Sequence, residues 1–314
     1  MAHAPAPCES RVVRSLRLPL LKTFAAVVAI AVAACTLVVA AQERFRTDVA
    51  IVTLNVAVRQ NGTPVRDLKA TDFDVTDNGV HQDVELTPVG VMPADVTVLV
   101  DTSASMDATL EQTRAQLADI AKQLRHDDRV RVLTVADDVR EVFGFRAGGS
   151  APPMDALAAG GWTSLYDALG LALIHRPSRE RGHLIVTFSD GIDSSSTIDL
   201  DTVTALARRS EAVVDLFVLV PKPLWQSPRA LPSREEPTLP PVARLVQRTG
   251  GDTRVVRATD NIAAAFRDAL TEYRRRYVLR YAMPAGAPGS WHDVKVAITQ
   301  RGRFDVLLRD GYTQ

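Results

Sequence analysis

The sequence is poor in cysteine. Its 314 residues include two, Cys8 and Cys35, and both lie within the first 41 positions. The rest of the chain therefore has no disulfide or thiol chemistry, and no cysteine and histidine cluster has the spacing of a zinc site. Disulfide-stapled and zinc-finger architectures are excluded for this part of the chain.

The sequence also lacks net charge, because 37 basic residues balance 37 acidic ones. Nothing in this balance points to nucleic acid as a partner. Without residues 1–41 the chain keeps 33 basic and 36 acidic residues, which suits a soluble surface and argues against a polybasic membrane patch. No internal repeat stands out. The length and the 46% hydrophobic content fit one large globular domain plus a small one.

The N-terminal segment differs from the rest of the chain. Four basic residues between positions 11 and 22 precede an apolar run over residues 24–41. This order predicts an export signal within residues 1–41, so we expect a periplasmic or secreted protein. The run is about 18 residues long, enough for an uncleaved membrane anchor. Val32-Ala33-Ala34-Cys35 also resembles a lipobox, which leaves a cleaved signal, an anchor and a lipoprotein open.

Two β-rich segments flank the middle of the chain. Residues 44–93 contain short strand patterns, two of them separated by Asp77-Asn78-Gly79, a strong hairpin-turn signal. Residues 277–314 return to a strand pattern. Neither segment has enough strands to bury a core alone, so we expect them to pair in one β module.

Residues 94–276 alternate short apolar strands with amphipathic helices, which predicts an α/β domain with a doubly wound, mainly parallel sheet. Residues 221–241 interrupt this pattern with seven prolines and predict a surface loop. Within it, Trp225 is equally a packing residue or a contact anchor. The expected strands cover 96–100, 129–135, 139–145, 183–191, 213–220 and 252–256, with a turn at 136–138 between the second and third. The expected helices cover 107–126, 163–175, 200–212, 241–251 and 261–276.

Polar side chains follow the expected strands. Asp101, Ser103 and Ser105 come directly after the first strand of the α/β unit, and Asp190 follows a later one. Thr163 lies where a Gly-Gly loop enters a helix. With a strand order of 3-2-1-4-5-6, these residues meet in the crevice beyond the carboxyl ends of the strands. Carboxylate and hydroxyl oxygens suit a hard cation, Mg²⁺ first, with Mn²⁺ or Ca²⁺ as alternatives.

Simpler interpretations exist for single residues. Ser105 and Ser164 could cap helices, and Ser164 with Asp167 has the spacing of a capping box. His175 and His183 are expected at the surface or at a strand edge. The basic clusters 179–181 and 274–276 are expected as solvated helix ends. An aspartic peptidase would need a glycine after Asp101-Thr102 and a second such motif, and the sequence has neither. A serine nucleophile would need a histidine near it, and no histidine lies beside these residues in the sequence.

The pattern Asp101-x-Ser103-x-Ser105, with Thr163 and Asp190, resembles the metal-ion-dependent adhesion site of von Willebrand factor type A domains over about residues 94–276. The resemblance implies that Ser103, Ser105 and Thr163 ligate the ion directly, while the two aspartates act largely through water. Ala104 replaces the usual glycine of this motif. The whole chain, with its flanking β segments, is similar to the bacterial exported "VWFA-related" family.

These features predict an adhesion-type binding module and no enzyme. We expect it to bind a protein or extracellular ligand, through a divalent ion that a carboxylate of the partner completes. Trp162, Asp193 and Trp225 are the candidates for the ligand rim. In the alternative, the chain is a periplasmic scaffold or assembly factor in which the ion is structural. Membrane contact is expected only through the N-terminal segment.

Overall fold

The computed structural model describes residues 50–88, 92–149, 157–175, 177–178, 180–220, 239–257 and 260–314. The predicted leader and Trp225 lie outside the described residues. The chain divides into two units, residues 1–50 and 51–314, and the account below concerns the second. In the described part of the chain, no helix is long and apolar enough to cross a membrane.

The α/β domain is organised on a six-stranded sheet with the order β11-β10-β9-β6-β7-β8. Neighbouring strands are parallel except for the β7–β8 hairpin, which is antiparallel. Counted along the domain, this is the predicted order 3-2-1-4-5-6, and the predicted fold class is confirmed. The strands are β6 (Ala94–Asp101), β7 (Arg129–Val135), β8 (Val139–Ala147), β9 (Gly182–Ser189), β10 (Val213–Val220) and β11 (Thr253–Arg257).

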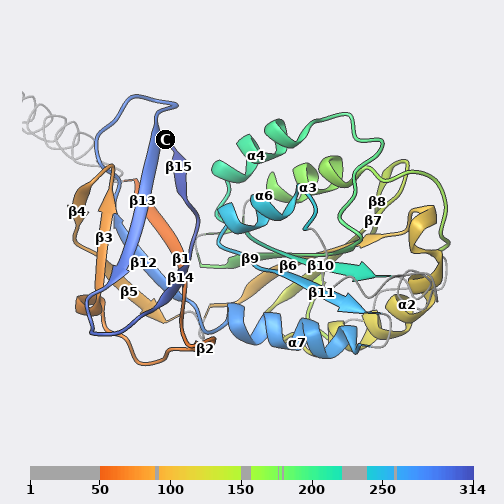
Figure 1. The fold of residues 1–314 in the computed structure, drawn as a ribbon, viewed down its shortest axis with the longest axis horizontal. Helices are drawn as coiled ribbons and strands as arrows, with labels where there is room; N and C mark the ends of the chain where they lie inside the picture. Colours follow the sequence, from red (N-terminus) through yellow and green to blue (C-terminus); the bar gives the residue numbers. More distant parts are fainter. Residues whose placement is uncertain are drawn as a thin grey trace, which may run out of the picture. The chain divides into compact units, whose positions relative to one another are not determined.

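Helices cover both faces of this sheet (Figure 1). One face carries α2 (Asp107–Lys122) and α7 (Ile262–Tyr273), and the other carries α3 (Leu165–Leu173), α4 (Leu200–Arg208) and α6 (Ala243–Arg248). A single turn of 3-10 helix, η3 (Ala104–Met106), links β6 to α2. The result is a three-layer α/β/α domain.

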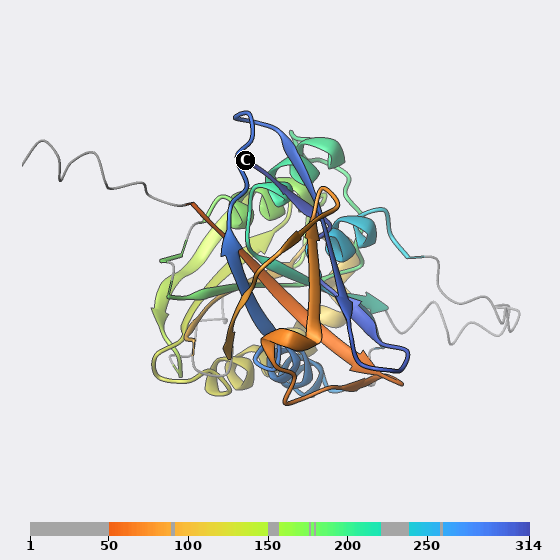
Figure 2. The ribbon, with the colours of Figure 1, turned by 90° about the vertical axis from the view of Figure 1, so that its left-hand side faces the viewer.

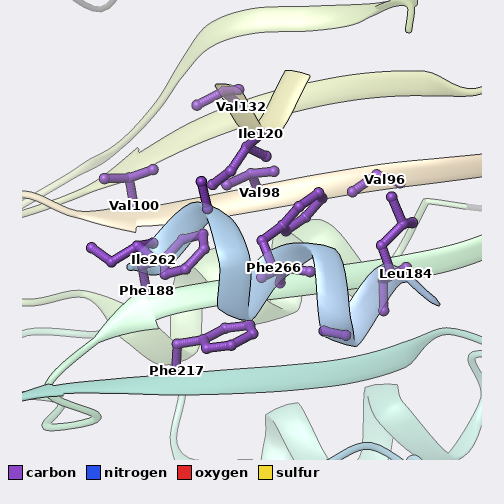
Figure 3. Packing of buried hydrophobic residues seen from close by; sticks show 14 of the residues in the cluster. Val96, Val98, Val100, Ile120, Val132, Leu184, Phe188, Phe217, Ile262 and Phe266 are labelled. Carbon is purple, nitrogen blue, oxygen red and sulfur yellow. The ribbon is translucent and has the colours of Figure 1, made fainter. Parts of the chain in front are cut away.

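Side-chain alternation along β6 divides the core into two halves. Val96, Val98 and Val100 point to the face covered by α7, where they pack with Phe188 and Phe266 (Figure 3). Leu99 belongs to the cluster on the opposite face, with the side chains of α3, α4 and α6. Each strand of a doubly covered sheet must be apolar on both sides, which explains why the strands read as nearly continuous apolar runs.

The N-terminal and C-terminal segments together form a β module of two sheets, one ordered β14-β1-β12-β5 with β2 on β1, the other β15-β13-β3-β4. Strands from the two ends of the described chain pair with each other in both sheets, as the orange and blue arrows of Figure 2 show. They alternate in the first sheet and meet at the β13–β3 pair in the second. Its elements are β1 (Ile51–Gln60), β2 (Thr63–Pro64), η1 (Ala70–Asp72), β3 (Phe73–Asp77), β4 (Val80–Gln82), β5 (Glu85–Pro88), β12 (Tyr277–Ala282), β13 (Trp291–Ile298), β14 (Asp305–Leu307) and β15 (Gly311–Thr313).

One buried carboxylate joins four strands of the module. Asp77, at the end of β3, is 2% exposed. Its Oδ2 accepts hydrogen bonds from the hydroxyls of Tyr281, at 2.9 Å, and Tyr312, at 2.8 Å. The Nδ1 atom of His292 lies 2.7 Å from Oδ1. Charge-assisted bonds of this kind hold the two sheets in register. Asn78 and Gly79 form the predicted turn with positive φ.

Three expectations, for Arg276, Arg181 and His183, were wrong. Arg276 is 4% exposed and so is not part of a solvated helix end, although Arg275 beside it is exposed. Arg181 donates hydrogen bonds to Asp95 at 2.6 Å and to the Ala94 carbonyl at 3.1 Å. His183 is 2% exposed, on a central strand rather than at the surface. In each case a tertiary partner or neighbouring strand that local sequence does not reveal covers the side chain.

Candidate functional site

The candidate site begins where β6 ends, at Asp101. The Ser103 amide donates to Asp101 Oδ1 at 2.9 Å, which turns the chain into η3. On the neighbouring strand β9, the Ser189 hydroxyl donates to Asp101 Oδ2 at 2.5 Å. Ser189 in turn accepts from the Gly191 amide at 2.9 Å. Both carboxylate oxygens are therefore fixed between two adjacent parallel strands.

A chain of side-chain oxygens runs from this carboxylate across the crevice. Ser103 Oγ lies 3.1 Å from Ser105 Oγ, and Ser105 Oγ donates to Asp190 Oδ2 at 2.8 Å. The other oxygen of Asp190 accepts the Ile192 amide at 3.0 Å. The structure thus brings four of the five predicted residues together through hydrogen bonds.

The fifth residue, Thr163, lies on a loop that the backbone holds against the same turn. The Gly160 amide donates to the Thr102 carbonyl at 2.9 Å, and the Ala104 amide donates to the Gly161 carbonyl at 3.1 Å. Gly161 has a φ of 75°, and a Cβ there would lie 2.2 Å from Asp137 Oδ2. The positive φ and this close approach favour glycine at position 161.

Thr163 is also tied to the loop that follows Asp190. Its amide donates to Ser194 Oγ at 2.9 Å, and its carbonyl accepts from the amides of Ser194, at 2.9 Å, and Ser195, at 3.1 Å. The residue is 5% exposed. Its own hydroxyl has no hydrogen-bond partner in the part of the chain that the structure describes. Thr163 therefore joins the set through its backbone, which leaves its hydroxyl available for a ligand.

The helix-capping interpretation of these serines was wrong. Ser105 directs its hydroxyl to Asp190, not to a helix amide. Ser164 occupies the N-cap position of α3 without a side-chain cap bond, and its hydroxyl donates to the Asp137 carbonyl at 3.0 Å. Asp167 accepts instead from the amides of residues 197 and 198, at 2.9 and 3.0 Å. Side-chain oxygens here hold loops to one another rather than begin helices.

The electrostatics of the site favour a cation. Burial raises the pKa of Asp101, and the nearby charge of Asp190 adds to this, while hydrogen bonds from Ser103 and Ser189 oppose it. A positive ion would offset both the desolvation and the repulsion between the carboxylates. The donors are all oxygen, the chemistry of Mg²⁺, Mn²⁺ and Ca²⁺. Among the described residues no group of three His, Cys, Asp or Glu side chains could hold a metal, so this site depends on hydroxyls.

The rim of the site is more apolar than the sequence indicated. Trp162 is 69% exposed and Ile192 60% exposed, on the two loops that meet at Thr163. Asp193, predicted as a rim residue, accepts hydrogen bonds from the Tyr166 amide at 3.1 Å and the Ser196 hydroxyl at 2.5 Å. Its carboxylate thus holds the loop in place.

Sequence reasoning missed the residues that support the donors. Ser189 fixes Asp101, Asp137 accepts the Trp162 amide at 2.8 Å, and Ser194 binds the Thr163 amide. Ser189 could have been found, because it directly precedes Asp190 at the end of the same strand. Asp137 and Ser194 lie in separate loops, and no local pattern connects them to the site.

These features define a class of protein. It has an open, doubly wound α/β domain, with carboxylates and hydroxyls gathered beyond the ends of β6 and β9. Residues 95–222 match the sequence model of the von Willebrand factor type A domain, and the chain therefore carries such a domain. The predicted resemblance is confirmed for this part of the chain. No curated protein matches the sequence.

Several solved structures are similar to this chain. The conserved hypothetical protein BatB from Bacteroides thetaiotaomicron is 16% identical, with 57% of this chain and 98% of that chain covered at a TM-score of 0.41. A von Willebrand factor type A protein from Catenulispora acidiphila is 13% identical, with coverages of 84% and 75% and a TM-score of 0.45. Proximal thread matrix protein 1 from the mussel byssus, solved with a zinc-occupied MIDAS motif, is 13% identical, with coverages of 65% and 50% and a TM-score of 0.46.

Proposed function

We propose that this protein is an exported binding module that recognises a protein or extracellular ligand through a divalent cation. The residues that would hold the ion are Asp101, Ser103, Ser105, Thr163 and Asp190. Mg²⁺ is the first choice and Mn²⁺ or Ca²⁺ the alternatives, because hard cations prefer oxygen donors. The proposal assigns binding, not catalysis, to this edge of the sheet.

One observation carries this proposal. The Ser103, Ser105 and Asp190 oxygens form a hydrogen-bonded chain, while the Thr163 hydroxyl on the facing loop forms no hydrogen bond with any described residue. It can therefore bind a ligand without breaking a hydrogen bond within this part of the protein. A bound cation would be coordinated by the Thr163 hydroxyl. It would also replace the hydrogen bond between Ser105 and Asp190 by coordinating the oxygens of both side chains.

The charge of the site indicates what the partner offers. Two carboxylates and three neutral hydroxyls leave a divalent ion with positive character and with room for a further donor. A carboxylate, from an Asp or Glu side chain of the partner, supplies that donor with the matching charge. The exposed side chains of Trp162 and Ile192 would pack against apolar groups beside this acidic residue.

Export is part of the proposal and rests on the sequence of residues 1–41. Basic residues followed by an apolar run are the pattern of a secretion signal. A periplasmic or secreted location suits an ion site that millimolar divalent cations would keep loaded. Attachment to the membrane would then come only from the N-terminal segment, if it is retained or lipidated.

The test is a crosslinking pull-down from the native cell envelope with the wild-type chain, run with and without chelator. Partners should be lost in chelator and in the Thr163→Ala variant, which removes one proposed ligand. Thr197→Ala is the matched control, because Thr197 is exposed and lies on a nearby loop of the same domain. Replacing the partner's contacting acid by Asn or Gln should abolish capture.

The alternative role as a periplasmic scaffold predicts a different outcome. There the ion would only stiffen the loops, so Thr163→Ala would lower the melting temperature while the partners remained bound. Full capture in excess chelator would place the recognition surface away from Asp190 and overturn the proposal.

A further inference from the structure

A cavity of about 320 Å³ lies at the opposite edge of the sheet from the candidate ion site. Its walls come from the start of β9, from the segment between α4 and β10, and from strands β1, β12 and β15 of the β module. Figure 1 shows the arrowheads of β10 and β11 pointing away from the β module, so the module adjoins the amino ends of these strands. The volume falls within the range of small-molecule pockets, about 300–1000 Å³.

Three arginines without a carboxylate partner line this cavity. They are Arg208, Arg209 and Arg309, and none of them forms a salt bridge with any residue that the structure describes. Glu211 also lines the cavity and is likewise outside the salt bridges of the described chain. The wall therefore carries an excess of positive charge.

Arg309 is the most enclosed of the three. Its Nη2 donates to the Thr53 carbonyl at 2.9 Å, and its Nη1 lies 3.5 Å from the Ser210 carbonyl. Its Nε is buried and has no hydrogen-bond partner among the described residues. Burial lowers the pKa of Arg309, as expected for a cation held away from water. The charge of Glu211 opposes this shift but does not outweigh burial.

Arg208 also has an unpartnered guanidinium nitrogen. Its guanidinium lies over the Trp291 ring, 4.7 Å from the centroid, and its Nε is buried without a partner in the described structure. The neighbouring Arg181, by contrast, is paired with the buried Asp95 at 2.6 Å. The fold thus gives Arg181 a salt bridge, whereas the acidic neighbours of Arg208 and Arg309, Asp310 and Glu211, form no salt bridge with them in the described structure.

One part of the wall is apolar, beside polar residues that include Thr53, Asn55 and Ser178. Side chains from β1, β12 and the adjoining segments line the cavity without any formal charge: Ile51, Val52, Met92, Ala212, Val278 and Met283. A ligand that fits both parts needs an anionic head near the arginines and an apolar body beside the β module. Carboxylates and phosphates match the fork of an arginine guanidinium.

We propose that this cavity is a second binding site, which takes a small organic anion with a carboxylate or phosphate head and an apolar body. It needs no metal, and it is independent of the proposed ion site. Because its walls come from both the α/β domain and the β module, an occupant would also strengthen their connection.

The test uses the chain as the expressing cell processes it, with hexanoate, hexyl phosphate and uncharged hexanol as probes. Binding is measured by saturation-transfer NMR and by the shift in melting temperature, with and without EDTA. We expect one or both anions to bind and hexanol to bind far less. Arg309→Gln and Arg208→Gln should each weaken binding at least about tenfold, whereas Arg303→Gln, an exposed control, should not.

The head group is identified by comparing the two anions, and either preference supports the proposal. If Arg309→Gln does not fold, Arg208→Gln decides, because its side chain is only partly buried. Three results would overturn the proposal: no binding of either anion at millimolar concentration, equal binding of hexanol, or undiminished binding in Arg208→Gln. Loss of binding in EDTA would also contradict it.

Discussion

Replacement of His183 should change how the stability of the protein depends on pH. The imidazole is buried on β9, with Nε2 3.1 Å from the Thr97 hydroxyl and Nδ1 without a partner among the described residues. Burial is the main reason why the pKa of His183 falls to about 3; charge repulsion from His175 and Arg131 contributes to this value, and Asp95 opposes it. The folded protein therefore keeps this ring neutral under mildly acidic conditions.

The sign follows from the unfolded state, in which the histidine has its ordinary pKa of 6.5. Below that value the unfolded chain binds a proton that the folded chain does not, so acid favours unfolding. Stability from this residue is complete above 6.5 and declines as the pH falls toward 3. Between pH 7.5 and pH 5 the loss is about 2 kcal/mol, at about 1.4 kcal/mol per pH unit below 6.5.

The assay is urea unfolding followed by circular dichroism at both pH values, for the wild-type chain and His183→Gln. Glutamine keeps a polar group near Thr97 but does not titrate. The wild type should lose about 2 kcal/mol more than the variant between the two pH values. His81→Gln, at an exposed position, is the control and should behave like the wild type. Equal pH dependence in the wild type and His183→Gln would refute the reasoning.

Three further predictions follow from the fold. Asp77→Ala removes the acceptor of two tyrosine hydroxyls and a histidine, so we expect a loss of about 3 kcal/mol in chemical denaturation, and an unchanged midpoint would contradict the cross-sheet role. Burial raises the pKa of Asp95, but hydrogen bonds outweigh it and hold the pKa at about 2. About 2 kcal/mol of stability should therefore be lost as the pH falls from 3.8 toward 2, and Asp95→Asn should flatten this decline. Residues 94–276 should fold alone and residues 44–93 should not, which well-dispersed NMR amide signals from isolated 44–93 would disprove.

Local pattern sufficed for much of the α/β domain. Short apolar strands alternating with helical periodicity predict the layers, and the position of Asp101 and Asp190 after two such strands predicts that they meet. The strand order follows from the same residues, because polar side chains after β6 and β9 can form one site only if those two strands are neighbours. These features depend on side-chain periodicity and on strand ends, which the sequence displays directly.

The supporting contacts could not be predicted in the same way. Ser194 reaches Thr163 across 31 residues, and Arg181 reaches Asp95 across 86 residues. Such pairs depend on how loops and strand ends meet in three dimensions. The capping interpretation of Ser164 failed for the same reason, because its hydroxyl donates to the Asp137 carbonyl and does not bind a helix amide.

Electron paramagnetic resonance of Mn²⁺ tests the central claim most directly, because bound and free Mn²⁺ give distinct signals. The chain should be titrated with Mn²⁺ beside the double variant Asp101→Asn, Asp190→Asn, which preserves side-chain shape but removes both charges. The account predicts one bound Mn²⁺ per wild-type chain, displaced by excess Mg²⁺, and none in the variant. Absence of bound Mn²⁺ in the wild type, or equal binding in the variant, would contradict it.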